Sequence, residues 1–183
     1  MTTTDHPLPR VLQPGDVPPL GTRVKIEADA AQRAALAALA DVVSVEAMTA
    51  EVLVSPWSDE GFAVTGKVTA KLTQTCVVTL EPIATSVEEE IDVKLVPPEA
   101  MAKYEIAPDE NGEIDLDASA LDQPDPLEGG VIDVGGIVIE HLMLGIDPYP
   151  RKPGAVFDAD SAGVGDGREA LSPFAALARL KKE

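Results

Sequence analysis

Apolar and polar residues alternate most regularly in the first part of residues 61–82. The apolar side of this alternation is formed by Phe62, Val64, Val68, Ala70 and Leu72, and the polar side by Thr65, Lys67, Thr69, Lys71 and Thr73. A period of two residues is typical of a β-strand with one buried and one solvated face, and β-branched residues suit such a strand. Only Gly66 interrupts the apolar side, which indicates a bulge or a close packing contact.

Two neighbouring segments alternate in the same way, so three long strands are predicted between residues 43 and 96. The first spans 43–55, its alternation drifts near its end, and turn residues follow it at 56–61. This short loop predicts that the first and central strands pair as an antiparallel hairpin. The third strand spans 83–96 and stops at Pro97-Pro98. Shorter strands are predicted at 10–13, 22–27 and 131–134.

Three segments are predicted to be helical. The first, 29–41, begins at Asp29, and Gln32 completes a capping-box pattern. The second, 135–144, repeats its apolar residues with a period near 3.6, is predicted to be buried, and ends at Gly145. The third, 172–182, has Ser172 as a natural N-cap and combines apolar with basic residues.

Residues 99–128 differ in character, because they hold ten acidic side chains and one lysine. Within them, 103–107 and 113–117 flank Asn111-Gly112 and predict a small hairpin. The remainder, 118–130, is predicted to be a loop. Such an acidic insert is usually a solvated surface, although it can also dock a basic partner.

Together these elements predict an α+β fold, a mainly antiparallel sheet or barrel-like meander with two or three helices and a flexible C-terminal tail. The predicted organisation is one domain over 1–154, a linker over 155–171 and a short amphipathic, basic helix over 172–183. The linker is expected to be disordered, because it carries Gly, Asp, Ser and Ala without periodicity.

Net charge limits the partners that the chain can bind. It is −18, from 32 acidic and 14 basic residues. A field of this sign repels nucleic acid phosphates, so DNA is not an expected partner, and any RNA contact needs a local basic patch or a partner protein. A membrane is not an expected partner either, because no apolar stretch approaches the length that spans a bilayer. One cysteine excludes an internal disulfide and a multi-cysteine zinc site. With no signal peptide and no apolar run of membrane-spanning length, the expected compartment is the cytoplasm.

Candidate chemistry is sparse. The histidines are His6, in a proline-rich segment, and His141, on an apolar helix, so neither is placed by the sequence beside a nucleophile. The sequence contains no Gly-x-Ser-x-Gly motif and no phosphate-binding loop. Asp109, Asn111 and Glu113 suggest a calcium loop, but their spacing is wrong for one. We therefore expect neither an enzyme nor a cofactor.

The segment Thr75-Cys-Val-Val-Thr-Leu-Glu-Pro82 resembles the signature of the YceD family, in which a strand ends in Cys-x-Arg-Cys-Leu-Glu-Pro or a variant. Later segments resemble that family in the same order. They are the acidic insert, 125–133 before the second helix, Asp147-Pro-Tyr-Pro-Arg-Lys-Pro-Gly154, and the closing segment 173–181. The resemblance covers roughly residues 8–183.

This resemblance implies a non-enzymatic role in the accumulation of large-subunit ribosomal RNA, hence in ribosome biogenesis. The family-motif positions are Cys76, Leu80, Glu81 and Pro82. Thr79 stands where the second family cysteine would be, and Val78 stands where the arginine would be. Some relatives hold further cysteines after the late helix, which suggest a metal, but a lone thiolate cannot form a four-ligand zinc site. Cys76 is therefore interpreted as a small packed residue at a strand end.

The leading hypothesis is a ribosome-assembly factor that acts through protein contacts. Its expected partners are ribosomal proteins or assembly factors, which the acidic insert and the C-terminal helix would contact, while direct rRNA binding would be weak or partner-assisted. The candidate contact residues are Arg151, Lys152, Phe174, Leu177, Arg179, Leu180, Lys181 and Lys182. The C-terminal helix could instead dock on its own domain. The alternative function is a general acidic adaptor or chaperone-like module unrelated to ribosomes.

Overall fold

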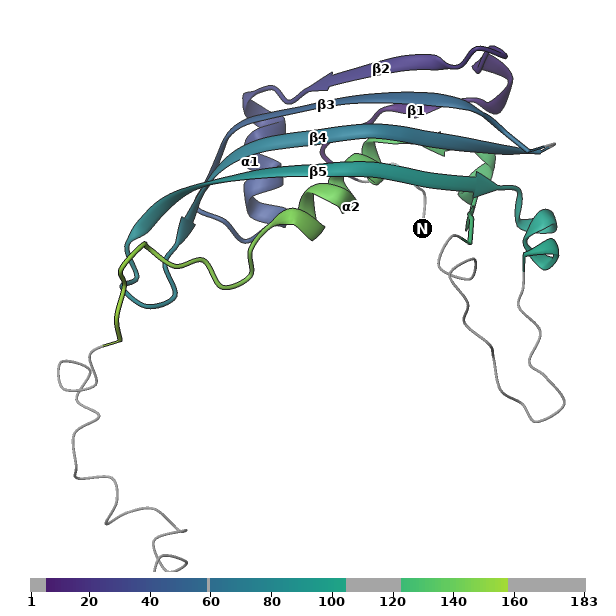
Figure 1. Cartoon of the computed structure of the whole chain (residues 1–183). Coiled ribbons are helices and arrows are strands. Elements are labelled where there is room, and N and C mark those ends of the chain that lie inside the picture. Colours follow the sequence, from purple (N-terminus) through teal and green to yellow (C-terminus); the bar gives the residue numbers. More distant parts are fainter. Residues whose placement is uncertain (1–5, 59, 105–122, 158–183) are drawn as a thin grey trace, which may run out of the picture.

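The computed structural model describes residues 6–58, 60–104 and 123–157. Its main element is a five-stranded sheet in the order β2-β3-β4-β5-β6, and β1 pairs with β7 in a separate two-stranded sheet. The strands are β1 (Val11–Leu12), β2 (Thr22–Glu27), β3 (Ser44–Trp57), β4 (Gly61–Thr75), β5 (Pro82–Val96), β6 (Asp125–Pro126) and β7 (Ile132–Asp133). The helices are α1 (Ala30–Leu39), α2 (Val134–Gly145) and the short 3-10 helices η1 (Pro14–Asp16), η2 (Pro98–Lys103) and η4 (Glu128–Gly130). Both α-helices lie on the same side of the five-stranded sheet (Figure 1).

The predicted α+β fold with a mainly antiparallel sheet is confirmed. Strands β2 to β5 pair antiparallel with their neighbours, whereas β6 pairs parallel with the end of β5. The long strands β3, β4 and β5 form the predicted meander, and β3 and β4 form the predicted hairpin. The sheet of the described residues is open, with β2 and β6 at its edges.

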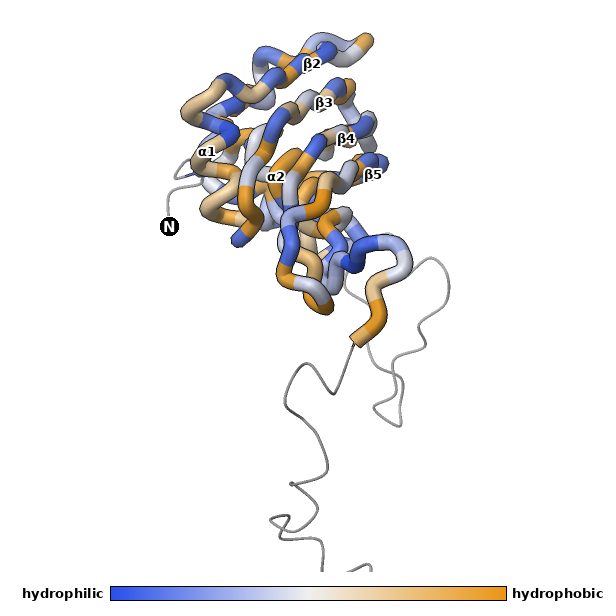
Figure 2. Tube along the Cα trace, turned by 90° about the vertical axis from the view of Figure 1, so that its left-hand side faces the viewer, coloured by the Kyte–Doolittle hydropathy of each residue, from blue (hydrophilic) through white to orange (hydrophobic). Residues whose placement is uncertain are grey.

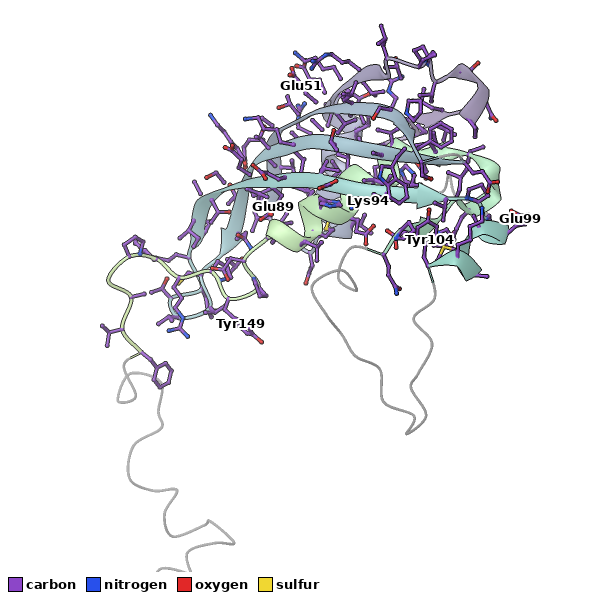
Figure 3. All side chains as sticks on the ribbon, turned by 45° about the vertical axis from the view of Figure 1, so that its right-hand side comes forward. Glu51, Glu89, Lys94, Glu99, Tyr104 and Tyr149 are labelled. Atoms are coloured by element: carbon purple, nitrogen blue, oxygen red, sulfur yellow. The ribbon has the colours of Figure 1, made fainter. Side chains whose placement is uncertain are left out.

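One face of the meander is buried and the other is solvated. The buried side chains of β4 and β5 include Val64, Val68, Ala70, Leu72, Val87, Ile91 and Leu95. Along the strands, hydrophilic and hydrophobic positions therefore alternate (Figure 2). Polar and charged side chains occupy the opposite face, where Glu51 points away from the helices (Figure 3). This alternation lets β-branched and aliphatic residues supply a core in a chain with few aromatic side chains.

The alternation of buried and exposed residues in β3 is interrupted at a different place from the one that the sequence predicts. The sequence predicts the interruption near the end of the strand, but the register shifts between Val45 and Ala47, near the start. A β-bulge inserts one extra residue and so moves the following side chains to the other face. Val45 is therefore buried together with the even-numbered residues Met48, Ala50, Val52 and Val54.

The predicted helices 29–41 and 135–144 are both confirmed. In α1 the Asp29 carboxylate accepts a hydrogen bond from Gln32 N at 2.8 Å, and the Gln32 side chain accepts one from Asp29 N at 2.9 Å, which completes the capping box. In α2 the Asp133 carboxylate accepts a hydrogen bond from Gly136 N at 3.0 Å. These caps satisfy amides that have no partner inside a helix.

Helix α2 covers β4 and β5, and the N-terminal segment crosses the start of this helix. Leu8 is fully buried, Gly135 N donates to Arg10 O at 3.0 Å, and His6 Nε2 lies 2.8 Å from Asp133 Oδ2. A side chain at Gly135 would overlap the backbone of Leu8. The glycine therefore allows the N-terminal segment to pack directly on the helix.

Several predictions about connecting segments are corrected or fall outside the description. Residues 56–57, predicted as part of a turn, continue β3, because Trp57 still pairs with Gly61. The predicted loop 118–130 contains β6 and η4. Lys103 belongs to η2 rather than to a hairpin strand, and the rest of that predicted hairpin lies outside the described residues. Almost all of the linker 155–171 and the whole helix 172–183 also lie outside them.

Gly66 marks a close packing contact rather than a bulge. It pairs with Val52 on β3 and with Ile91 on β5 without a register shift. A Cβ atom built on Gly66 would overlap the carbonyl oxygen of Glu51 and lie 2.7 Å from Val52 Cα. The central strand therefore needs a residue without a side chain at this position.

We expect Gly66→Ala to lower the free energy of unfolding by about 1–3 kcal/mol, because the added methyl group forces the β3 backbone away. Urea denaturation measures this change. Gly15→Ala is the matched control, since nothing lies within 4 Å of the Cβ position there. Equal stabilities of the two variants would contradict the close contact.

Candidate functional site

The family-like segment forms the turn between the two longest strands. We call residues 76–81, between β4 and β5, the signature turn, and residues 146–157, which follow α2, the strap. Cys76 N donates to Glu81 O at 2.8 Å, and Leu80 N donates to Cys76 O at 2.9 Å. The turn is therefore closed by its own backbone before Pro82 begins β5.

The strap is hydrogen-bonded to the signature turn, although some seventy residues of sequence separate the two segments. Val77 N donates to Pro150 O at 2.9 Å, and Lys152 N approaches Cys76 Sγ at 3.3 Å. The ammonium group of Lys152 lies 2.7 Å from the Glu81 carboxylate. These three contacts hold the strap in one position against the turn.

Gln74 anchors the start of the strap from the end of β4. Its side chain is 6% exposed. Its amide group donates to Asp147 O at 2.9 Å, and its carbonyl oxygen accepts a hydrogen bond from Thr85 at 2.9 Å. A buried amide with both ends bonded fixes the direction in which the chain leaves α2.

Cys76 is a packed residue at the end of β4, as the sequence predicts. Its side chain is 0% exposed, and its sulfur accepts hydrogen bonds from the backbone N–H groups of Lys152, at 3.3 Å, and Thr79, at 3.4 Å. Hydrogen bonding from the Thr79 side chain, followed by that from the backbone of Lys152, lowers the pKa of the Cys76 thiol to about 6. These donors stabilise the thiolate form of Cys76. Burial keeps the sulfur atom away from solvent.

Among the described residues, no hydrogen bond joins Cys76 to a histidine. His141 Nδ1 lies 2.9 Å from Ile137 O within α2, and His6 is bonded to Asp133 at the far end of that helix. Cys76 is the one cysteine at the turn that could bind a metal, since Thr79 occupies the position of the second family cysteine. The Cys76 sulfur already accepts hydrogen bonds from two backbone amides. The residues present at this turn therefore do not fit a four-ligand zinc site, and among the described residues no group of three potential ligands is assembled.

Apolar side chains are exposed on the signature turn and the strap. We call Val77, Leu80 and Tyr149, which are 43%, 76% and 70% exposed, the tip patch. Tyr149 projects from the strap away from the sheet (Figure 3). A hollow of about 260 Å³ lies beside Val77, between the end of α1 and the strap. The three side chains come from segments that are hydrogen-bonded to each other, and exposed apolar side chains on adjoining segments suit a protein contact surface.

Leu80 is held in an unfavourable backbone conformation. Its φ angle is 59°, in the left-handed region that residues with a side chain rarely adopt. The cost of this region for a residue other than glycine is about 1–2 kcal/mol. Since the leucine side chain makes little contact with the protein, its presence at this position is not explained by core packing.

Of the predicted basic contact residues, the structure describes Arg151 and Lys152. Lys152 pairs with Glu81, which lowers the pKa of the Glu81 carboxyl and raises the pKa of the Lys152 ammonium, in each case through hydrogen bonding first and charge second. Arg151 is exposed beside it. Of the family-motif positions, Cys76 is buried, Leu80 is exposed at the tip, Glu81 holds the strap and Pro82 begins β5. The remaining predicted contact residues, Phe174, Leu177, Arg179, Leu180, Lys181 and Lys182, lie outside the described residues.

Sequence reasoning missed Gln74, Val77 and Tyr149. Gln74 could have been recognised from the sequence, because it is a polar residue on the apolar side of the β4 alternation. The exposure of Val77 and Tyr149 had no signal in the sequence, since it depends on how the strap meets the turn.

The lowered pKa of Cys76 predicts a pH-dependent contribution to stability. The unfolded thiol titrates near its ordinary value of 9.0 and the folded thiol at about 6, so the folded state binds fewer protons between these values. The contribution is present above about pH 9 and is lost as pH falls through about 6. The stability difference between the unaltered chain and Cys76→Ser, measured by urea denaturation, should therefore grow as pH rises through this window.

Thr79→Ala provides the test of the cause. Because the Thr79 side chain makes the largest contribution, this variant should raise the midpoint of the thiolate absorbance titration. A midpoint that stays the same in Thr79→Ala would show that another group sets the pKa.

Comparisons with known proteins place the chain in a family. No curated protein and no solved structure gives a significant match. In the described part of the chain, no helix is long and apolar enough to cross a membrane. The family model described as large ribosomal RNA subunit accumulation protein YceD matches residues 64–181, which include most of β4, the signature turn, the strap and the acidic insert. The chain therefore belongs to the YceD family, whose name states a role in the accumulation of large-subunit ribosomal RNA.

Proposed function

We propose that this protein is a non-enzymatic factor that supports large-subunit rRNA accumulation by binding ribosomal proteins or assembly factors in the cytoplasm. The observation that carries the proposal is the exposed Leu80 in a left-handed conformation within the family signature. A side chain kept there at a cost in stability is best explained by a contact outside the chain.

The tip patch suits a protein partner because its conformation is fixed before binding. The signature turn is closed by its own hydrogen bonds, and the strap is bonded to it through Pro150 and Lys152. Little conformational entropy is then lost when a partner covers Val77 and Leu80. Tyr149 adds an aromatic ring with a polar end, which is common at protein interfaces.

The placement of the cations favours protein contacts over direct RNA contacts. Four described lysines lie next to a carboxylate, in the pairs Lys25–Glu51, Lys67–Glu88, Lys103–Glu60 and Lys152–Glu81. Each pair offsets a charge that could otherwise neutralise a phosphate, and the net charge of the chain is −18. Arg151 can add a contact to RNA once a partner protein has brought the two together.

A general acidic adaptor unrelated to ribosomes remains the alternative function. The two functions differ in co-sedimentation, since only a ribosome-assembly factor should move with large-subunit precursors on a sucrose gradient. Recovery of the protein solely in the free pool would favour the adaptor.

We expect Leu80→Gly to separate stability from function. Glycine relieves the left-handed strain, so the free energy of unfolding should rise by up to about 1 kcal/mol. The loss of the leucine side chain should weaken binding to large-subunit precursors about tenfold, a change of ~1.4 kcal/mol, and so lower the fraction that co-sediments with them. The measurements are urea denaturation and quantification of the protein across the gradient.

Leu20→Ser is the matched control, because Leu20 is 94% exposed and lies before β2, outside the signature turn and the strap. It should leave co-sedimentation unchanged. A Leu80→Gly variant that co-sediments and supports rRNA accumulation as well as the unaltered chain would remove the tip patch from the proposal.

A further inference from the structure

A second surface lies at the other end of α2 from the strap. A groove of about 320 Å³ opens between the end of β5, the short strand β6 and the first half of α2. We call it the acidic groove. It shares no residue with the signature turn, the strap or the hollow beside Val77.

The floor of the acidic groove is aliphatic. It is formed by Val93 and Leu95 of β5, by Leu127 and Val131 from the segment around η4, and by Ile137 of α2. Leu95 and Leu127 are 7% and 5% exposed, so they are already packed on the core. The parallel pairing of Leu95 with Asp125 and the hydrogen bond from Leu127 N to Val96 O, at 2.7 Å, fix this side of the groove. An aliphatic floor of this size accepts an apolar side chain.

The rim of the groove is acidic. Asp125, Glu128 and Glu140 are exposed, and their side chains make no hydrogen bond or ion pair with other residues that the structure describes. No lysine or arginine is among the described residues that line the groove. A cation on a ligand would therefore meet three carboxylates without displacing an existing ion pair.

Asp133 keeps the start of α2 from attracting an anion to this groove. Its carboxylate accepts a hydrogen bond from Gly136 N at 3.0 Å and lies 2.8 Å from His6 Nε2. The helix N-terminus, which would otherwise favour an anion, thus already has a carboxylate. Together with the rim, this disfavours a phosphate or another anionic ligand.

We propose that the acidic groove binds an extended basic segment of a partner protein, with one aliphatic side chain on the floor and flanking Lys or Arg side chains at the rim. Charge complementarity and the aliphatic floor select this occupant. Two rim residues, Asp125 and Glu128, belong to the acidic insert 99–128, so the groove gives part of that insert a defined partner-binding surface. The inference rests on the proposed function and deepens it by naming the chemistry of the partner.

The experiment titrates the isotope-labelled full chain with the synthetic peptide Lys-Lys-Leu-Arg-Lys and follows backbone amide signals by NMR. The signals of Leu127, Val131 and Ile137 should move, whereas those of the signature turn should not. A peptide with serine in place of leucine should bind about tenfold more weakly, because it buries no aliphatic side chain. Equal affinity of the two peptides, or shifts spread over the whole acidic surface, would overturn the proposal.

Paired charge reversals provide the matched control. Glu128→Lys with Glu140→Lys should weaken the leucine peptide about tenfold at low salt. The control variant, Glu27→Lys with Glu90→Lys, has the same net charge as the first variant, but its substitutions lie at exposed positions of β2 and β5. It should leave peptide binding nearly unchanged. Equal losses in both variants would show that net charge alone attracts the peptide.

Two further measurements identify the occupant of the groove and separate the groove from the tip patch. The chain's own residues 172–182 combine apolar and basic side chains as the peptide does. If the peptide moves the groove signals only in a chain that ends at Ala170, the occupant is this segment and the proposal is overturned. Leu80→Gly should bind the peptide normally, so failure at the groove and failure at the tip patch are distinguishable.

Discussion

The packing of helix α2 across the apolar face of β4 and β5 is the interaction on which the rest of the structure depends. The alternation in the two strands creates this face, and the aliphatic side chains of the helix, among them the fully buried Val134 and Val138, cover it. Gly145 allows the end of the helix to approach Val87 and Glu89 of β5. The first half of the helix lines the acidic groove together with β5 and β6, and the end of the helix leads into the strap, which bonds to the signature turn. One packing contact thus positions both candidate surfaces.

The two surfaces differ in charge and therefore suit different parts of a partner. At the tip patch, Lys152 and Glu81 neutralise each other, and the exposed groups are mainly apolar. At the groove, the carboxylates have no such cation among the described lining residues. A basic protein of the large subunit that contacts both would gain affinity from apolar burial at one end and from charge complementarity at the other. Neither surface offers the row of free cations that phosphate binding needs.

Much of the fold was predictable from local pattern, and most of the site was not. The alternation in β4 and β5, the capping box of Asp29 and Gln32, and the period of α2 are local signals, and the structure confirms the elements that they predict. The bulge between Val45 and Ala47 escaped prediction because it changes the register without changing the composition. Strand β6 escaped it because a two-residue strand exists only through its pairing with β5. The buried state of Cys76 was predicted, but no local pattern indicates that Val77 N bonds to Pro150 O of the strap, some seventy residues later, or that Leu80 stays exposed.

In the proposed function, proteins rather than RNA hold this factor on the large-subunit precursor. Affinity capture of the full chain from lysate tests this, in parallel with and without ribonuclease, with quantification of the large-subunit proteins that are recovered. We expect the same ribosomal proteins or assembly factors to be recovered in both samples. Recovery that occurs only while the RNA is intact would contradict the proposed function, and would mean that the cations of the chain bind rRNA despite its net charge of −18.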